Sequence, residues 1–299
     1  MKLCNVKIDG TVKLGIGREK DIVLVERALK HFPADGLAAN LSDLLAGGEE
    51  SVRKLDDYRR NLLEFGTLPD GCAIETDKAE FAPCVTNPGK LICIGLNYIK
   101  HAEESGLPVP VTPVVFSKFG NALAAHGDPI PLHGQVSGEV DYEAELGIVI
   151  GRRAKNVSRA EALSHVFGYC CVNDLSARDL QMRTSQWLLG KTLDLFCPIG
   201  PYLVTSDEVG NPNDLTIRCE VNGEVRQHSH TSDMVFPCDE IVSYLSRYMT
   251  LEPGDVIMTG TPEGVMFGYP EDKRVWLADG DVVTVEIEKL GRLTNRMVR

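Results

Sequence analysis

The chain has 299 residues, of which 43% are hydrophobic and 25% charged, a composition typical of a globular protein with a sizeable core. Its 31 Lys and Arg against 43 Asp and Glu give a net charge of -12, which argues against nucleic acid or an anionic membrane as a partner. The sequence lacks an apolar run of the roughly 20 residues that a membrane span needs, and its opening does not resemble a signal peptide. Its nine cysteines lack C-x-x-C spacing, so we expect a cytoplasmic protein with reduced thiols.

Residues 1–66 are predicted to form a small α+β domain. Lys2–Ile8 and Thr11–Ile16 flank a two-residue turn, a pattern that indicates a β-hairpin. The run Ile22–Phe32 fits the strand period and the helix period equally well, so both structures stay open for it. Apolar residues at helical spacing predict surface helices over Leu41–Leu45 and Ser51–Phe65.

A larger, β-rich domain is predicted over residues 91–299. Three prolines, Pro69, Pro83 and Pro88, indicate that residues 67–90 form a linker before it. Strand-like runs then outnumber helical ones, which favours a β-rich α+β fold over a doubly wound α/β sheet. The expected strands are Leu91–Gly95, Val114–Ser117, Ala144–Ile150, Phe167–Asn173, Leu215–Val221, Asp255–Thr259 and Val282–Glu288. The expected helices are Arg159–His165 and Asp239–Tyr248.

The stretch from Asp141 to Gly151 begins with acids and continues as an apolar, β-branched run. It predicts a strand that leaves a polar pocket and enters a core. Glu143 and Glu145 stand at i and i+2, so they point to the same side of that strand. Two carboxylates so close repel each other unless a proton or cation lies between them, and oxygen ligands favour Mg2+, Mn2+ or Ca2+. The alternative is that the pair is the solvated face of an amphipathic strand.

Asp174 follows the expected strand Phe167–Asn173, at the point where an apolar run opens into a polar loop. A carboxylate at this place is well positioned to be a third oxygen ligand beside Glu143 and Glu145. Three carboxylates around one ion would leave up to three positions of an octahedral Mg2+ for water or substrate. As an alternative, Asp174 is the N-cap of a helix that begins at Leu175.

His101 and Glu104 follow the expected strand Leu91–Gly95 and stand three residues apart. If this segment forms a helical turn, the two side chains share a face and can form a hydrogen bond. A carboxylate on one imidazole nitrogen fixes the tautomer and leaves the other nitrogen free to accept a proton. The alternative is a surface histidine beside a surface glutamate.

Polar residues after Asp174 form a further candidate cluster. Arg178 and Gln181 share a face if their segment is helical, and Lys191 lies farther along the chain. Next to a metal ion, such groups can hold an anionic substrate or a developing oxyanion. Thr261 lies in a turn rich in glycine and backbone N–H groups, which can receive a carboxylate. Each of these residues is also compatible with an ordinary surface position or a tight turn.

Taken together, these segments resemble the fumarylacetoacetate hydrolase family. The resemblance covers residues from about 90 to 299 in collinear order, whereas residues 1–66 match only loosely. The matching stretches are Gly95–Tyr98 with His101 and Glu104, Asp141–Gly151, Asn173 and Asp174 with Ser176–Asp179 and Gln181, Gly190 and Lys191 with Pro198–Pro201, Val221–Glu224, and Leu251–Asp255 leading into Thr259–Gly264.

The resemblance implies a mixed β-roll fold, a homodimer and a Mg2+ or Mn2+ ion, with Ca2+ as an alternative in crystals. It implies that the metal ligands are Glu143, Glu145 and Asp174, that His101 and Glu104 form a water-activating dyad, and that Arg178, Gln181, Lys191 and Thr261 surround the substrate.

The activity that we expect first is hydrolysis of the C3–C4 bond of a 2,4-dioxo acid, an acylpyruvate. Lys191 and Gln181 would stabilise the oxyanion, and pyruvate and a second acid would be released. The alternatives are oxaloacetate decarboxylation or tautomerisation, ureidoglycolate cleavage and isomerisation of 2-hydroxyhepta-2,4-diene-1,7-dioate, all of which are found among similar proteins. An alternative of another class is a metal-dependent binding module that has lost catalysis. In every case we expect a small 2-oxo or 2,4-dioxo acid as the ligand.

Three stretches differ from the pattern that is common in the family. The family often has Gly-Val-Gly where this chain has Gly264–Gly268 with Met266 in its centre, and a proline often follows the residue equivalent to Lys118. The loop from Gln181 to Lys191 is also short. All three border the expected pocket, so they bear on the choice of substrate more than on the chemistry.

Overall fold

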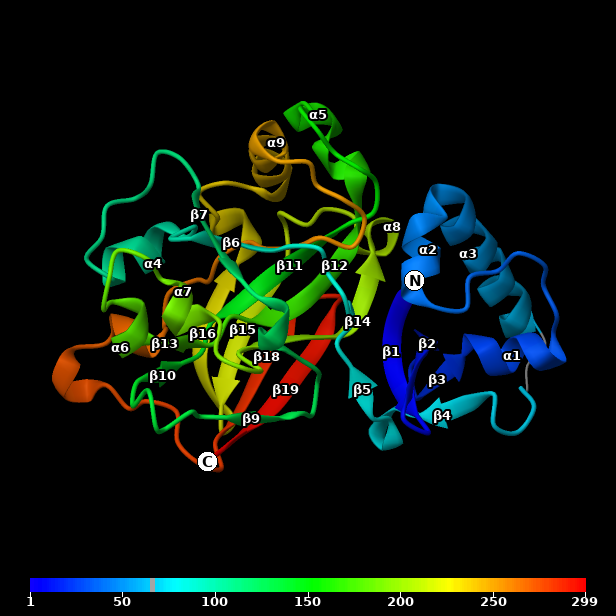
Figure 1. Ribbon diagram of the computed structural model, residues 1–299, viewed down its shortest axis with the longest axis horizontal. Helices are drawn as coiled ribbons and strands as arrows, with labels where there is room; N and C mark the ends of the chain where they lie inside the picture. The colour runs from blue at the N-terminus through cyan, green and yellow to red at the C-terminus, as the bar shows by residue number, and fades with distance from the viewer. Residues whose placement is uncertain (65–67) are drawn as a thin grey trace.

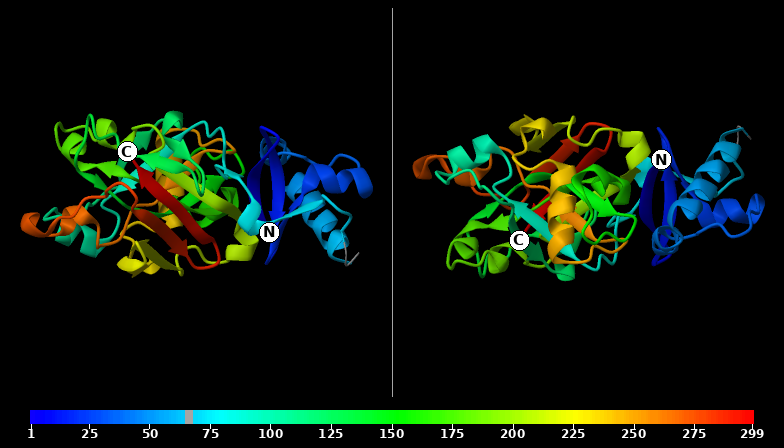
Figure 2. Two further views of the ribbon diagram at one scale, coloured as in Figure 1. Left: turned by 90° about the horizontal axis from the view of Figure 1, so that it is seen from below. Right: turned by 90° about the horizontal axis from the view of Figure 1, so that it is seen from above.

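The computed structural model describes residues 1–64 and 68–299. The molecule is elongated, with the N-terminal elements at one end and the larger β-rich part at the other (Figure 1, Figure 2). The last residue of the predicted helix, Phe65, and the predicted domain boundary at residue 66 lie outside the described residues.

One large mixed sheet runs through the described part of the chain, with the strand order β4-β3-β2-β1-β14-β12-β11-β17-β6-β7. Two short strands lie off this path, because β5 pairs with β1 and β8 pairs with β14. The strands are β1 (Lys2–Ile8), β2 (Thr11–Gly17), β3 (Asp21–Leu24), β4 (Ala73–Glu75), β5 (Phe81–Ala82), β6 (Leu91–Gly95), β7 (Val114–Lys118), β8 (Leu123–Ala124), β11 (Ala144–Ile150), β12 (Val166–Asn173), β14 (Cys197–Thr205) and β17 (Val256–Met258).

A second sheet has the order β16-β15-β18-β19-β9, and a two-stranded ladder joins β10 to β13. These strands are β9 (Pro129–Pro131), β10 (Val140–Asp141), β13 (Ser176–Ala177), β15 (Thr216–Val221), β16 (Glu224–His230), β18 (Val282–Ile287) and β19 (Gly291–Val298). The helices are α1 (Val25–His31), α2 (Leu41–Ala46), α3 (Gly48–Glu64), α4 (Ile99–Glu104), α5 (Arg159–Ala162), α6 (Arg178–Gln181), α7 (Leu188–Lys191), α8 (Ser206–Val209) and α9 (Cys238–Tyr248). Several sheets with scattered helices confirm the predicted β-rich α+β class.

The segment Ile22–Phe32, for which the sequence allowed either a strand or a helix, contains one of each. Strand β3 occupies its first residues and α1 begins immediately afterwards at Val25, so the segment is both strand and helix. The predicted hairpin is present, and its turn residues Asp9 and Gly10 have φ of 49° and 75°, as a two-residue turn of this kind requires. Strands β4 and β5 fall within residues 67–90 and pair with β3 and β1, so part of this range belongs to the N-terminal sheet. The division into two domains and a linker stays a prediction.

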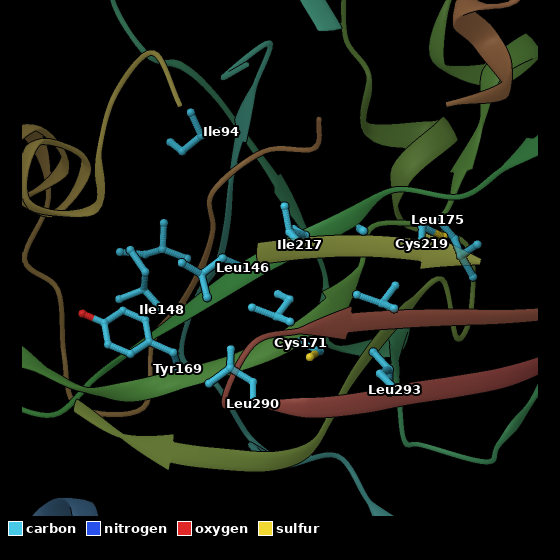
Figure 3. Packing of buried hydrophobic residues seen from close by; sticks show 14 of the residues in the cluster. Ile94, Leu146, Ile148, Tyr169, Cys171, Leu175, Ile217, Cys219, Leu290 and Leu293 are labelled. Atoms are coloured by element: carbon cyan, nitrogen blue, oxygen red, sulfur yellow. The ribbon is translucent and has the colours of Figure 1, made fainter. Parts of the chain in front are cut away.

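One hydrophobic core lies between the large sheet and the five-stranded sheet, and a second packs N-terminal residues against Val149, Cys170 and Val172 of the large sheet. Strands β11 and β12 are buried along their whole length, and Leu146, Ile148 and Tyr169 from them pack against Ile217 and Leu293 from the facing sheet (Figure 3). Burial on both faces explains why these strands are nearly continuous apolar runs. The site residues lie at one end of this buried pair.

Candidate metal centre and active site

Glu143, Glu145 and Asp174 converge at the end of the β11–β12 pair. One carboxylate oxygen from each of them lies within 4.8 Å of the other two, and the three side chains are buried. Antiparallel pairing places Ala144 opposite Asn173, so the residue before β11 comes beside the residue after β12. The Asp174 N–H then donates to the Glu143 carbonyl at 2.9 Å. Asp174 therefore caps no helix at Leu175 but faces the two glutamates.

Two buried lysines neutralise part of this negative charge. Lys191 Nζ lies 2.7 Å from Glu143 Oε2 and 2.8 Å from Asp174 Oδ2, so it bridges two of the carboxylates. Lys118 Nζ donates to Asp174 Oδ1, and to the Leu175 carbonyl at 2.9 Å. Lys191 and Lys118 are 1% and 2% exposed, which a lysine tolerates only when its charge is compensated. Both therefore belong to the site.

Glu145 differs from the other two acids in its partners. Its Oε2 accepts the Gly260 N–H at 2.8 Å, and no cationic side chain within residues 1–64 and 68–299 forms an ion pair with it. Burial, with the negative charges of Asp174 and Glu143, raises the pKa of Glu145 well above its ordinary value. Burial would also raise the pKa of Glu143, but the charges of Lys191 and Arg178 outweigh it and lower that pKa to about 2.

This arrangement fits a divalent cation. The donor set is three carboxylates, the hard oxygen ligands that Mg2+ and Mn2+ prefer. Burial and the negative charges of Asp174 and Glu143 raise the pKa of the Glu145 carboxyl, and a cation between the three carboxylates would remove the repulsion. Glu143, Glu145 and Asp174 can therefore hold a metal ion, and their assignment as ligands remains a prediction.

The turn after β17 is shaped to reach Glu145. Gly260 has φ of 98°, and a Cβ there would lie 2.7 Å from Asn97 Cβ and 2.9 Å from the Ile94 carbonyl. Glycine is therefore required for the backbone N–H to approach the carboxylate. The Asn97 side chain fixes this region by donating to the Thr259 and Phe236 carbonyls at 2.7 and 3.0 Å.

The predicted dyad is formed at the edge of the pocket. His101 and Glu104 both lie on α4, and His101 Nδ1 is 2.9 Å from Glu104 Oε1. Glu104 Oε2 accepts the Gly264 N–H at 2.9 Å. With Nδ1–H donated to the carboxylate, His101 Nε2 keeps a lone pair that can accept a proton.

Arg178 stands on α6, in contact with Glu143. Its Nη1 is 2.8 Å from Glu143 Oε1 and 2.9 Å from Gln181 Oε1, and its Nε donates to Asp141 Oδ2 at 2.8 Å. Thr261 Oγ1 accepts a hydrogen bond from Gln227 Nε2 at 2.9 Å, which leaves its own O–H as a donor.

One pocket contains nearly all of these groups. It is lined by the two glutamates and by every predicted dyad or substrate residue except Glu104, which lies behind His101. Aromatic and aliphatic side chains form the rest of the wall, so the pocket joins an apolar surface to a few charged groups. The lining residues are Ile94, Gly95, Leu96, His101, Ser105, Leu107, Phe116, Glu143, Glu145, Arg178, Gln181, Met182, Trp187, Lys191, Thr261 and Phe267.

The structure thus brings together all nine residues that the sequence singled out, and it adds others. Sequence reasoning missed Lys118, Asp141 and Gln227 as supports of the site, because each reaches its partner across more than 30 residues of chain. It also missed the aromatic wall of Phe116, Trp187 and Phe267. The departures from the family pattern at Lys118 and around Met266 were a signal that these segments border the pocket.

Comparison with known proteins places the chain in a family. A family model described as fumarylacetoacetate (FAA) hydrolase C-terminal matches residues 90–298. The chain belongs to the fumarylacetoacetate hydrolase family. This match confirms the family to which the sequence motifs pointed.

Relatives with known names extend this result. An oxaloacetate tautomerase from Xenopus laevis, fahd2, named as mitochondrial, is 48% identical over 216 residues, which are 72% of this chain and 67% of the relative. The structure of fumarylacetoacetate hydrolase from Exiguobacterium antarcticum superposes with a TM-score of 0.81 at 35% identity and covers 100% of this chain and 99% of that chain. Fumarylpyruvate hydrolase from Pseudomonas aeruginosa, solved with Mn2+ and pyruvate, has a TM-score of 0.65 at 34% identity and covers 75% and 92%.

The helices of the structure and the name of the Xenopus relative bear on the predicted location. No helix among the described residues is long and apolar enough to cross a membrane. The Xenopus relative is named as mitochondrial, so the predicted cytoplasmic location is not confirmed. It stays a prediction, as does the homodimer that the family resemblance implies.

Proposed function

We propose that this chain catalyses the keto–enol tautomerisation of oxaloacetate, with a divalent cation held by Glu143, Glu145 and Asp174. The observation that carries the proposal is His101, hydrogen-bonded to Glu104, in the same pocket as Glu143 and Glu145, whose carboxylates converge with that of Asp174. Tautomerisation requires removal of a proton from one carbon, which is the task that an oriented imidazole performs. The name of the Xenopus relative supports oxaloacetate as the substrate.

The chemistry divides between the ion and the side chains. A bound divalent cation would polarise the 2-oxo group and stabilise negative charge that develops on its oxygen. His101 Nε2 takes a proton from C3 of the keto form and, as the imidazolium, gives it to the former 2-oxo oxygen, so that the C3–H bond breaks and the O–H bond of the enol forms. The reverse reaction runs the same two transfers backwards. Glu104 keeps the ring in the required tautomer, and Arg178 presents a cation to the substrate from the opposite side.

Hydrolysis of an acylpyruvate is the second candidate, and the same dyad supports it. If His101 accepts a proton from water instead of from carbon, the resulting hydroxide can attack the C4 carbonyl. Lys191 and Gln181 line the pocket and can stabilise the oxyanion. The fumarylpyruvate hydrolase relative gives this candidate its support.

The experiment that separates the two candidates offers the Mn2+-loaded protein enol-oxaloacetate and acetylpyruvate in parallel. Enol absorbance follows the loss of each substrate, and proton NMR identifies the products. Glu145→Gln removes a proposed ligand. Glu220→Gln is the matched control, because Glu220 is also a buried glutamate but pairs with Arg292 and does not line the pocket.

The products decide the outcome. Loss of the enol signal with oxaloacetate remaining intact supports tautomerisation. Release of pyruvate and acetate from acetylpyruvate, with no acceleration of oxaloacetate ketonisation, would make the protein a hydrolase. Pyruvate formed from oxaloacetate would make it a decarboxylase. Activity that persists in Glu145→Gln would remove Glu145 from the metal site.

A further inference from the structure

Asp141 is a buried carboxylate that collects four hydrogen bonds from three segments. Its Oδ2 accepts Arg178 Nε–H at 2.8 Å and the Phe267 N–H at 2.9 Å. Its Oδ1 accepts the N–H groups of Met266 and of the adjacent Tyr142, both at 2.9 Å. Asp141 is 0% exposed, and both of its side-chain oxygens accept hydrogen bonds, so the buried carboxyl group has its partners within the protein.

One of these segments, residues 264–268, also holds the dyad. We call it the 264–268 loop. The Gly264 N–H donates to Glu104 Oε2 at 2.9 Å, and a Cβ on Gly268 would lie only 2.5 Å from Glu104 Cδ. The loop is therefore fastened at two carboxylates, Glu104 beside His101 and Asp141 beside Arg178. The five residues of the 264–268 loop therefore connect the Glu104 carboxylate to the Asp141 carboxylate.

The side chains of the 264–268 loop add to this connection. The ring of Phe267 lines the pocket, and the Arg178 guanidinium lies 5.4 Å from its centroid. Met266 is 2% exposed, and its sulfur accepts the Val275 N–H at 3.1 Å. The residue that departs from the family pattern thus anchors the loop, and its neighbour forms part of the pocket wall.

The Arg178 guanidinium contacts two carboxylates, those of Glu143 and Asp141. Its Nη1 lies 2.8 Å from Glu143 Oε1, while Asp141 holds Nε and lies 2.8 Å from Nη2. Arg178 also lines the pocket, so its positive charge faces an anion bound there. The ion pair with Asp141 keeps the guanidinium from turning fully onto Glu143.

We infer that Asp141 is a positioning residue for anion binding, which sets the direction of the Arg178 guanidinium and the place of the 264–268 loop. This inference takes the class of substrate, a small 2-oxo acid, from the proposed function. In Asp141→Asn, the negative charge is lost and an amide N–H2 faces backbone donors. Arg178 then has Glu143 as its remaining carboxylate partner, and one of the two oxygens that accept the Met266 and Phe267 N–H groups is replaced by N–H2.

The test measures binding and so does not require turnover. Isothermal titration calorimetry gives the Kd of the Mn2+-loaded protein for pyruvate and the Kd of the metal-free protein for Mn2+. Asp141→Asn is compared with Asp255→Asn, the same change at another buried aspartate, which accepts the Glu252 N–H at 2.7 Å and pairs with Lys90. A double-mutant cycle with Arg178→Gln shows whether Asp141 acts through Arg178.

We expect Asp141→Asn to weaken pyruvate binding about tenfold or more, since it removes charge-assisted hydrogen bonds. Its Mn2+ affinity should stay within about threefold of wild type, and Asp255→Asn should change neither constant. In the Arg178→Gln background, Asp141→Asn should have little further effect.

Three results would overturn the inference: unchanged pyruvate affinity, an equal loss of Mn2+ affinity, or additive effects in the cycle. If Asp141→Asn does not fold, Asp141→Glu takes its place, because the longer side chain keeps the charge but moves the carboxylate. Pyruvate binding as tight as wild type in Asp141→Glu would contradict a positioning role.

If no substrate is turned over but Asp141→Asn still loses pyruvate binding, the proposed reaction fails and the positioning role stands. If wild type does not bind pyruvate, both fail.

Discussion

The two sides of the pocket are built differently. On the strand side, Glu143, Glu145 and Asp174 extend from the ends of β11 and β12, two fully buried strands. On the loop side, His101 and Glu104 stand on a helix of six residues that depends on the 264–268 loop for its position. The strand side is fixed by sheet pairing and ion pairs, whereas the loop side is fixed by a few backbone N–H groups. The carboxylates are therefore held by many contacts, whereas the proposed proton-transfer group is held by a few that one substitution can move.

The largest effect is expected on the strand side. Glu145→Gln replaces a proposed ligand that forms no ion pair among the described residues, so Mn2+ should no longer bind and turnover should fall about ten-thousandfold, since a catalytic metal contributes several kcal/mol. Calorimetry with Mn2+ and the enol assay measure the two losses. Glu220→Gln should retain both metal and activity, and Mn2+ affinity unchanged in Glu145→Gln would contradict the assignment.

The next effect separates the two sides. His101→Asn removes the proton acceptor from the loop side, so turnover should fall about a thousandfold while Mn2+ affinity stays as in wild type. The same assay and titration measure this contrast. His126→Asn serves as the control, because His126 is a partly buried histidine whose ring packs on Phe81. Equal loss of metal and turnover in His101→Asn would show that the sides are not independent.

A smaller effect probes the 264–268 loop directly. Gly268→Ala places a methyl group against the Glu104 carboxyl carbon, so the dyad should shift and turnover should fall about tenfold, with Mn2+ affinity unchanged. Gly134→Ala is the matched control, because a Cβ there meets nothing within 4 Å. Turnover rates give the result, and full activity in Gly268→Ala would mean that the dyad does not depend on the loop.

The smallest effect concerns pH and the strand side alone. The pKa of Glu145 is raised in the metal-free protein, so below that pKa the carboxyl keeps its proton and Mn2+ must displace it. The apparent Kd for Mn2+ should therefore fall as the pH rises, by about tenfold per pH unit in that range. Calorimetry in two buffers of different ionisation heat counts the protons released. Affinity that is independent of pH, without proton release, would contradict the raised pKa.

Local patterns predicted much of the strand side. The spacing of Glu143 and Glu145, and the place of Asp174 after an apolar run, were enough to suggest three converging carboxylates, because strand geometry acts over a few residues. The same holds for β6, β11 and the helical turn that carries His101. Strand β14 was not predicted, since its prolines and glycine conceal the extended conformation that sheet pairing imposes.

Contacts between distant segments could not be predicted. Asp141 meets Met266 and Phe267 across 125 and 126 positions of sequence, and neither a period nor a motif encodes such a pair. The segment Ile22–Phe32 shows a related limit, because its change from strand to helix at Val25 is decided by pairing of β3 with β2 and not by local preference.

The pairing of β1 with β14 within the large sheet has a consequence for solubility. Strand β1 pairs with β14 at Lys2–Val204 and Leu3–Leu203, and the rest of its length pairs with β2 and β5. Without β1, that part of β14 would present unpaired N–H and C=O groups beside apolar side chains, a template on which another chain can add a strand. By pairing with β14, β1 covers a strand edge through which the larger β-rich part could otherwise aggregate.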